Sequence, residues 1–471
     1  MAAVFGVIAA DLSSAGILGS EAQVCGGKGR LVPDVWMFQI GATGRTYEMI
    51  RSLLPLTALL MGSAFLLFAG GLNSLILPVR GEAEGFTAAS LGLLGTGWAI
   101  GYVAGCLRTP ALVARVGHIR AFGAMCALAS IAVLMSLIVI DPWVWIPVRA
   151  VSGFCFAGAA MIVESWLNER SDRASRGRIF GIYTMVNLAA TTAGQMVLTL
   201  GDANGYFFFV LAAMVYCLAL LPTAISATST PTPLTSVSLD LRGLWKNSPI
   251  SFFAVLMVGV SNAAFGTLAA VYAARMELPL GDIALFASLP ISAAAALQIP
   301  VGLASDRFDR RLVLIVIAVI AILSDALFLF GGFSDPVVLM GLSAVFGATV
   351  FSMYPVIVAH ANDHAAPGTF IQVSGGLLLV YGIGSIVGPT VAGLAMSSYG
   401  APSLFAVTGT AHILLVMFAV VRLRTAPAVA PEDKGSFQAI PNARAITPET
   451  AALAADEAEL NSDRAQQAAP E

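Results

Sequence analysis

The sequence predicts an all-α polytopic membrane protein, with twelve transmembrane helices arranged as two pseudo-symmetric six-helix bundles. Three observations support this fold class: a low charge content, twelve apolar segments of spanning length, and an internal repeat. Of the 471 residues, 58% are hydrophobic and 11% are charged, whereas roughly 25% of the residues in an average soluble domain carry charge. A chain with so few charged residues is suited to a lipid bilayer and poorly suited to water.

The twelve apolar segments are each long enough to cross a bilayer, which requires about 20 mostly apolar residues in a helix. Helices are expected because every backbone polar group in lipid must bond within its own segment. The segments of the first half are 53–79, 88–107, 120–140, 143–165, 179–200 and 206–226. Those of the second half are 251–274, 282–304, 312–332, 337–359, 370–396 and 402–422.

The composition changes between the sixth and seventh segments. A linker rich in Ser, Thr and Pro, residues 227–250, separates a bundle at 49–226 from a bundle at 251–424. The tail at 425–471 is rich in Ala, Pro and Glu, so we expect it to be disordered. Residues 1–48 leave two alternatives open, a disordered extension or an over-extended start of the reading frame.

Basic residues predict the orientation in the membrane. Seventeen Lys and Arg residues lie in the linkers and tail on one side, and the other side has only Arg80 and Arg275. The positive-inside rule assigns the basic side to the cytoplasm. We therefore expect a multi-pass protein of the cell inner membrane with both termini in the cytoplasm.

A dense group of charges lies between two apolar segments, in the stretch "GLASDRFDRR" at 302–311. An offset of 192 residues aligns Arg115 with Arg307, each in the linker after the second helix of its half. An offset of 194 aligns "NERSD" with "NDHAA" and Gly194 with Gly388. These matches indicate a duplicated six-helix unit, and paired repeats with a binding site between them are typical of secondary transporters.

The stretch "GLASDRFDRR" also resembles the loop signature of the major facilitator superfamily. Asp309 stands where the signature has its second Gly; the matching residues are Gly302, Asp306, Arg307, Arg310 and Arg311. The copy expected after the second helix, "PALVARVGHIR", keeps Arg115 and Gly117 but has Pro110 and Ala114 in place of Gly and Asp. Three further stretches, "LPVRGEAEGF", "ESWLNERS" and "YPVIVAHAND", resemble the YcaD-type branch of this superfamily.

The resemblance implies a secondary active transporter that moves a small molecule by alternating access. Proton coupling is plausible because the chain has no nucleotide-binding loop of the type GxxxxGK[ST]. We expect a monomer in contact with lipid, with a small-molecule substrate and protons as partners, no cofactor, no metal and no nucleic acid. The alternative is a non-transporting membrane protein of the same fold, such as a receptor or assembly factor. An enzyme is not expected, since HExxH and GxSxG motifs are absent from the sequence.

A cytoplasmic gate is the first site that the resemblance implies. In the family, the Asp and Arg of the signature hold neighbouring helix ends together when the cytoplasmic side is shut. The repeat predicts two ion pairs, Arg307 with Asp363 and Arg115 with Glu169. The predicted gate residues are Gly302, Asp306, Arg307, Arg310, Arg311, Asp363, Arg115, Gly117 and Glu169. For Arg310 and Arg311, topology alone is an alternative explanation.

A substrate cavity is the second predicted site, because the first, fourth, seventh and tenth helices of the family line one. Arg149 lies inside the fourth segment, where an Arg costs about 2.5–3.5 kcal/mol on insertion scales and needs a polar surrounding. Asn73, Asn262 and Tyr354 lie on the other three helices. The alternatives are an Arg149 that reaches the headgroups, and amides that form interhelical hydrogen bonds.

Two buried acids and one small-residue stretch complete the predictions. Glu164 and Asp325 are candidates for proton coupling. A carboxyl group half in lipid, as expected for Glu164, has its pKa raised by desolvation, and an ionisable group as deep in a membrane segment as Asp325 is a functional candidate. Glu164 could instead pair with nearby arginines, and Asp325 could bond to a neighbouring helix. Gly384, Gly388 and Pro389 predict close helix packing in the eleventh segment.

Overall fold

The computed structural model describes residues 35–169, 176–225, 240–365 and 369–425, together with residues 429, 434, 435, 437 and 447. The chain divides into two compact units, Met1–Leu53 and Leu54–Glu471. Most of the predicted N-terminal extension lies outside the described residues. Its last part is helical, because the first described helix begins at Val35, before the predicted start at Met49.

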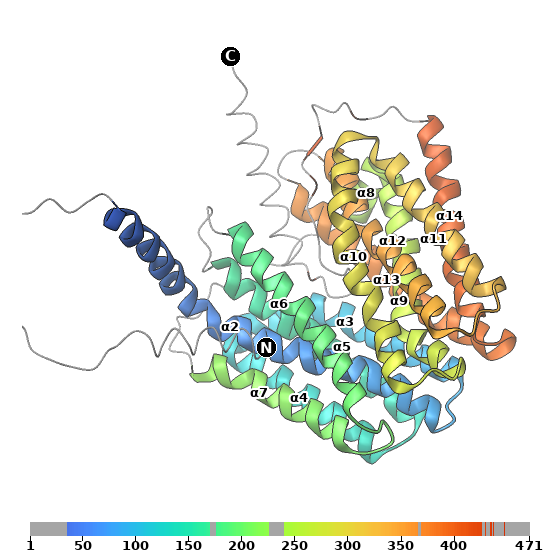
Figure 1. Cartoon of the computed structure of the whole chain (residues 1–471), viewed down its shortest axis with the longest axis horizontal. Coiled ribbons are helices and arrows are strands. Elements are labelled where there is room, and N and C mark those ends of the chain that lie inside the picture. The colour runs from blue at the N-terminus through green and yellow to red at the C-terminus, as the bar shows by residue number, and fades with distance from the viewer. Residues whose placement is uncertain are drawn as a thin grey trace, which may run out of the picture. The chain divides into compact units, whose positions relative to one another are not determined.

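The regular structure of the described residues is helical (Figure 1). The first half contains α2 (Val35–Ala83), α3 (Ala88–Val116), α4 (His118–Ile138), α5 (Pro142–Glu169), α6 (Arg176–Met196), η1 (Val197–Leu200) and α7 (Phe207–Ile225). The second half contains α8 (Leu241–Asn247), α9 (Pro249–Arg275), α10 (Leu280–Arg307), α11 (Arg310–Phe330), α12 (Pro336–Asp363), α13 (Phe370–Tyr399) and α14 (Ser403–Thr425).

Among the described helices, eleven are long and apolar enough to cross a membrane. Each of them coincides with one of the twelve predicted segments. The remaining predicted segment, 179–200, forms α6 and η1. Asn187, Thr191 and Gln195 lower the hydropathy of α6, and all three line an internal cavity. A helix that faces a polar interior needs fewer apolar side chains than one that faces lipid on most sides.

The helix ends follow local sequence signals. Thr87 caps α3 by accepting a hydrogen bond from the Ser90 amide at 3.1 Å, and Asp335 caps α12 by accepting one from the Val337 amide at 2.8 Å. Gly117 has φ +83° between α3 and α4, a left-handed conformation that glycine adopts without a steric penalty. The turn therefore explains why a glycine stands at this position of the signature.

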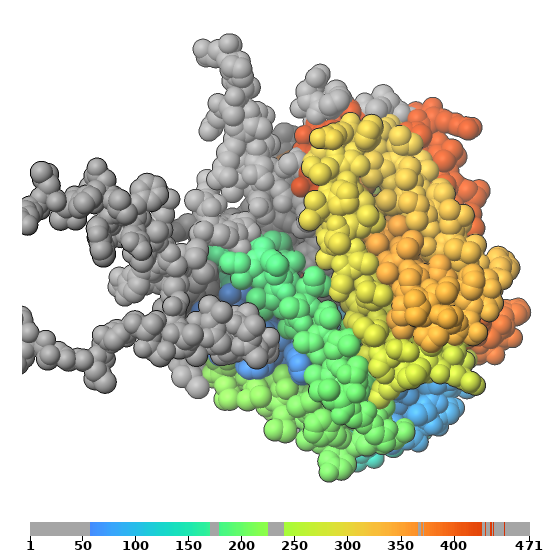
Figure 2. Space-filling view, viewed as in Figure 1, coloured from blue at the N-terminus to red at the C-terminus, as the bar shows by residue number. Residues whose placement is uncertain are grey.

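Within the second unit, the helices contact one another in two groups. The helix α5 contacts α3 and α4, and α4 contacts α7. The helix α9 packs against α13 and α14, and α12 packs against α10 and α11 (Figure 1). The two groups meet where α3 contacts α13 and α9, and where α10 contacts α6, as Figure 2 shows in yellow and green.

The first and fifth helices of each half cross at glycines. A Cβ atom at Gly71 of α2 would overlap the Thr191 backbone of α6, and one at Gly194 would overlap the Phe68 backbone. In the second half, a Cβ at Gly388 of α13 would overlap the Val260 backbone of α9. The aligned residues Gly194 and Gly388 thus have the same role, which is to let two helix backbones touch.

Candidate functional site

A cavity of about 160 Å³ lies between helices of both halves. Its lining comes from α2, α3, α5, α6 and α7 of the first half and from α9, α10 and α12 of the second. Arg149 of α5, Asn73 of α2 and Asn262 of α9 line it together. Their exposed fractions are 7%, 2% and 1%, so these three polar side chains are withdrawn from bulk solvent.

Several amide atoms at the cavity have no hydrogen-bond partner among the residues that the structure describes. The side-chain oxygens of Asn73, Gln195 and Asn262, and the Asn262 side-chain nitrogen, are buried and make no hydrogen bond within the described part of the chain. Burying such a group without a partner costs about 1–3 kcal/mol. These atoms are therefore suited to bind a polar ligand or water.

Aromatic side chains form another part of the cavity wall. Trp98 of α3 lies with its ring centroid 5.9 Å from that of Phe156, and both residues line the cavity. Tyr216, Phe265 and Phe351 also contribute to the wall. The cavity thus offers apolar surface beside a small number of polar groups, as ligand sites generally do.

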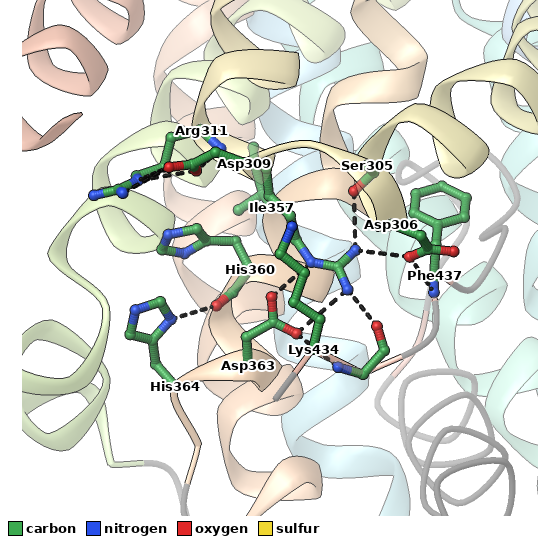
Figure 3. Close-up of polar contacts among 12 residues, drawn as sticks. Ser305, Asp306, Asp309, Arg311, Ile357, His360, Asp363, His364, Lys434 and Phe437 are labelled. Carbon is green, nitrogen blue, oxygen red and sulfur yellow. Dashed lines mark hydrogen bonds and ion pairs between the residues drawn. The ribbon is translucent and has the colours of Figure 1, made fainter. Parts of the chain in front are cut away.

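At one end of the second unit, Ser305, Asp306 and Asp363 lie in one polar cluster (Figure 3), and the buried Arg310 bonds to all three. Its Nε lies 2.6 Å from Asp363 Oδ2, and its Nη1 donates to Ser305 Oγ at 2.9 Å. Nη1 also lies 3.4 Å from Asp306 Oδ1. The side chains of Arg310 and Asp363 are 1% and 2% exposed. We call this end, where α10 meets α11, the Arg310 end.

Asp309 and Arg311 form a second pair at the Arg310 end. Arg311 Nη2 lies 2.7 Å from Asp309 Oδ2, and Arg311 Nη1 donates to the Arg422 carbonyl of α14 at 3.2 Å. Burial opposes the ionisation of Asp309, but its hydrogen bonds from Arg311 outweigh burial, so the Asp309 pKa lies below its ordinary value. The acids interleaved in "GLASDRFDRR" therefore bond the arginines beside them.

Residues of the C-terminal segment also contact the Arg310 end. The Gly435 amide donates to Asp363 Oδ1 at 3.0 Å, and the Phe437 amide donates to Asp306 Oδ1 at 3.0 Å. Lys434 Nζ donates to the Phe308 carbonyl at 2.7 Å. Most of the tail that was expected to be disordered lies outside the described residues.

The other ends of α2 and α9 are joined by an ion pair. Arg275 Nε lies 2.8 Å from Glu82 Oε1, and Arg275 Nη2 lies 3.1 Å from Glu82 Oε2. The Ala89 amide of α3 donates to Ser397 Oγ of α13 at 2.9 Å near the same end. We call this end the Glu82 end, and the two halves are in direct polar contact there.

Two acids are buried within the helices. Glu164 of α5 accepts a hydrogen bond from the Tyr183 hydroxyl at 2.9 Å and another from Thr447. Asp325 of α11 accepts one from the Thr408 hydroxyl at 2.6 Å. Its second oxygen lies 2.7 Å from His412 Nδ1 of α14. Asp325 is thus bonded to a neighbouring helix, which was one of the two expectations for it.

The network of Asp325 extends to the seventh membrane segment. His412 Nε2 lies 2.8 Å from the Ser261 hydroxyl of α9, and Ser261 directly precedes the cavity residue Asn262. Asp325, His412 and Ser261 are each at most 3% exposed. His412 and Ser261 were not among the predicted site residues, because no local sequence pattern brings three separate helices together.

Comparison with known proteins agrees with this arrangement. The sequence profile of the Major Facilitator Superfamily matches residues 59–295 and 252–457. The chain belongs to the Major Facilitator Superfamily. It is thus a multi-pass membrane transporter by family, and such transporters act on small-molecule substrates.

Relatives confirm the resemblance to the YcaD-type branch. The chain is 24% identical over 369 residues to an uncharacterized MFS-type transporter YcaD of Salmonella arizonae, covering 77% of this chain and 94% of that protein. It is 23% identical over 366 residues to an uncharacterized MFS-type transporter of Yersinia pestis, with the same coverage.

Solved superfamily structures share the fold. The nucleoside transporter NupG superposes with a TM-score of 0.68 at 16% identity, covering 79% of this chain and 99% of that chain. A bacterial homologue of the human lysosomal transporter Spinster, in an inward-facing and occupied conformation, superposes with a TM-score of 0.64 at 16% identity. That match covers 82% of this chain and 98% of the Spinster homologue.

In this superfamily member, the partner of Asp363 differs from the prediction. The structure pairs Asp363 with Arg310 in place of Arg307. Arg307 is the last residue of α10 and is exposed, whereas Arg310 is the first residue of α11 and is buried. The start of α11 therefore directs Arg310, and not Arg307, toward the end of α12.

The first half contains the less complete copy of the signature, around Arg115 and His118. Arg115 and Glu169 are both exposed, and their predicted ion pair stays a prediction. The offset of 192 that aligns the two signatures places Arg310 on His118. His118 is the first residue of α4, stacks on Trp166 at 5.8 Å and interacts electrostatically with Glu169.

Tyr354 is not among the residues that line the cavity of this transporter. Its ring lies 5.6 Å from that of Tyr381 of α13 in an edge-to-face arrangement. Conversely, Gln195 and Asn187 of α6 line the cavity and were missed. Their signal was present, because the segment at 179–200 is polar for a membrane helix.

Proposed function

We propose that this chain is a secondary active transporter that moves a small molecule across the inner membrane by alternating access. The observation that carries the proposal is the cavity shared by both halves, with Arg149 and Asn73 from one half and Asn262 from the other. A site at the interface of two repeats is exposed to each side in turn when the repeats rock against each other. The Arg310 end faces the cytoplasm in this proposal, by the positive-inside rule.

The ion pair of Glu82 with Arg275 supports assigning this structure to an inward-facing conformation, which is closed on the outer side. It joins α2 to α9, and therefore one half to the other, at the end that would face outward. The pair of Arg310 with Asp363 lies within the second half. We propose that Glu82 and Arg275 close the outer side, and that the signature residues hold α10, α11 and α12 together at the inner side.

Proton coupling forms part of the proposal. Asp325 and His412 are the titratable groups of a buried network that reaches Ser261, the neighbour of Asn262 in the cavity. Ionisable residues within membrane segments are functional candidates by default, because burying them is costly. A proton bound by this pair would alter the contact of α9 with α14 and thereby influence the cavity.

Transport can be tested without knowing the substrate. Proteoliposomes containing the full chain would be loaded with a small-molecule extract of the host cell, and the released compounds would be identified by mass spectrometry. We expect a few compounds to leave these vesicles faster than they leave vesicles without protein. A pH gradient imposed across the vesicle membrane should change the rate at which these compounds are released. Ligand binding without any flux would contradict the proposal and favour a receptor on the same fold.

A further inference from the structure

Part of the C-terminal segment is bound to the helices. The residues that make these contacts, which we call the docked tail, are Lys434, Gly435, Phe437 and Thr447. At the Arg310 end, the Gly435 amide donates to Asp363 Oδ1 at 3.0 Å, and the Gly435 carbonyl accepts a hydrogen bond from Arg310. The Phe437 amide donates to Asp306 Oδ1 at 3.0 Å (Figure 3). Three charged residues of the second half thus hold the tail by its backbone.

The ring of Phe437 adds a side-chain contact on α10. A Cβ atom at Gly302 would overlap this ring, and Gly302 is buried. The ring therefore occupies space that any residue other than glycine would fill at this position. Gly302 is the first residue of the stretch that matches the family signature, so in this chain the signature glycine also makes room for the docked tail.

Thr447 connects the docked tail to the first half. Its side chain is buried, with 0% exposure, and its hydroxyl donates to Glu164 Oε2 of α5. The other carboxylate oxygen, Glu164 Oε1, accepts from the Tyr183 hydroxyl of α6 at 2.9 Å. Glu164 is 1% exposed. One oxygen of this buried acid is therefore bonded within the first half, and the other is bonded by the tail.

The docked tail thus bonds to both halves at once. Asp306 and Asp363 belong to α10 and α12, whereas Glu164 belongs to α5. When two repeats rock against each other, residues of different halves at the same side of the membrane change their separation. Contacts made to both halves in one arrangement are then lost in part in the other. A partner that binds one conformation better shifts the equilibrium toward that conformation.

We propose that the Arg310 end and Glu164 form a docking surface for the chain's own C-terminal segment, and that the docked tail is an autoinhibitory strap. It holds the inner ends of the two halves in the arrangement seen here, and it leaves before the inner side closes. This inference rests on the proposed function, since the strap regulates the exchange between inward-facing and outward-facing conformations.

Docking can be measured by hydrogen exchange of the full chain in detergent, followed by mass spectrometry. The amides of Gly435 and Phe437 both donate to carboxylates, so they exchange with solvent only when the tail leaves. We expect slow exchange in the peptide that carries these two amides. Phe437→Ala removes the ring from Gly302 and should speed exchange of the Gly435 amide several-fold.

The effect on conformation is measured separately, in right-side-out membrane vesicles. Ser74 lines the cavity, and labelling of Ser74→Cys by an impermeant maleimide added from outside reports opening of the outer side. The same chain without Ser74→Cys gives the background. Thr447→Val should raise this labelling by about tenfold, because a hydrogen bond to a charged group contributes about that factor. Phe437→Ala should raise it as well, and it provides the test if Thr447→Val fails to fold.

Two matched variants separate the strap from a general loss of stability. Thr447→Ser keeps the hydroxyl and should label like the parent. Thr425→Val removes a hydroxyl that bonds to the Val421 carbonyl within α14, and it should also label like the parent. Equal labelling of Thr447→Val and Thr447→Ser would contradict a role for the bond to Glu164.

The outcomes distinguish this inference from the transport proposal. Rapid exchange of the Gly435 and Phe437 amides in the parent, or labelling unchanged by both Thr447→Val and Phe437→Ala, would overturn the strap. Flux of small molecules in proteoliposomes together with such unchanged labelling would leave transport standing without the strap. Raised labelling in both variants without any flux would support the strap and contradict transport.

Discussion

Arg275 and Glu82 join the two halves through two parallel contacts, Nε to Oε1 at 2.8 Å and Nη2 to Oε2 at 3.1 Å. The side chains are 26% and 22% exposed, so solvent screens the pair in part. Ion pairs near the surface contribute about 1 kcal/mol or less. Such a contact can hold one conformation without preventing its exchange with another.

Glu82→Gln is expected to weaken closure of the Glu82 end. The population open at that end should rise by about fivefold at most, since the pair contributes about 1 kcal/mol or less. The measurement is labelling of a Ser74→Cys side chain in the cavity by an impermeant maleimide added from outside. Glu84→Gln is the matched control, because Glu84, in the turn after α2, pairs with Arg80 of the same half. Faster labelling in the control than in Glu82→Gln would argue against this role.

Asp363→Asn is expected to destabilise the protein strongly. It leaves the buried Arg310 without its closest carboxylate, and breaking a buried pair by removing one partner costs about 3–5 kcal/mol. Thermal unfolding in detergent should show a clearly lower Tm. Arg307→Gln, at the exposed neighbour, should lie within about 0.5 kcal/mol of the parent. Similar losses in both variants would mean that Arg310 is not the principal partner of Asp363.

The Asp309–Arg311 pair should be insensitive to pH in the neutral range. The folded-state pKa of Asp309 is lowered, so its contribution to stability is present above the unfolded value of about 3.9 and is lost as pH falls through the folded value. Tm measured between pH 8 and pH 3 should therefore lose this contribution only at the acid end. Asp309→Asn should have a lower Tm than the parent at pH 7. At the acid end of the range, the Tm values of the variant and the parent should approach each other.

Gly388→Val is expected to disrupt the crossing of α13 with α9. The added atoms would overlap the Val260 backbone, and overpacking costs about 1–3 kcal/mol or more. Gly341→Ala on α12 is the control, because open space surrounds Gly341 and Ala stabilises a helix by about 0.5–1 kcal/mol over Gly. Folding yield and Tm distinguish the two; an unchanged Tm in Gly388→Val would show that the helices can separate at little cost.

Asp325→Asn is expected to uncouple transport from protons. The variant keeps the side-chain shape and the bond from Thr408, but it cannot take up and release a proton. Accumulation driven by a pH gradient should fall toward the level without a gradient, while exchange of substrate across the membrane continues. Ser343→Ala, a buried hydroxyl that bonds within its own helix, is the control. Undiminished pH-driven accumulation in Asp325→Asn would exclude this network as the coupling site.

Much of the fold could be predicted from local sequence. Apolar length placed the membrane segments, because a helix must satisfy its own backbone in lipid. The repeat aligned Gly194 with Gly388, and the structure gives both the same packing role. Asn73, Arg149 and Asn262 were selected as rare polar residues on the helices expected to face the centre, and they line one cavity.

The sequence alone determined which segments cross the membrane and which residues are too polar for lipid, since both depend on side-chain chemistry near one position. Only the tertiary structure decided the partners: Arg310 for Asp363, His412 for Asp325, and Glu82 for Arg275. A partner is set by the rotation and crossing of separate helices. Arg307 ends α10 and Arg310 begins α11, so these neighbours in the sequence belong to different helices, and hydropathy does not record where either side chain points.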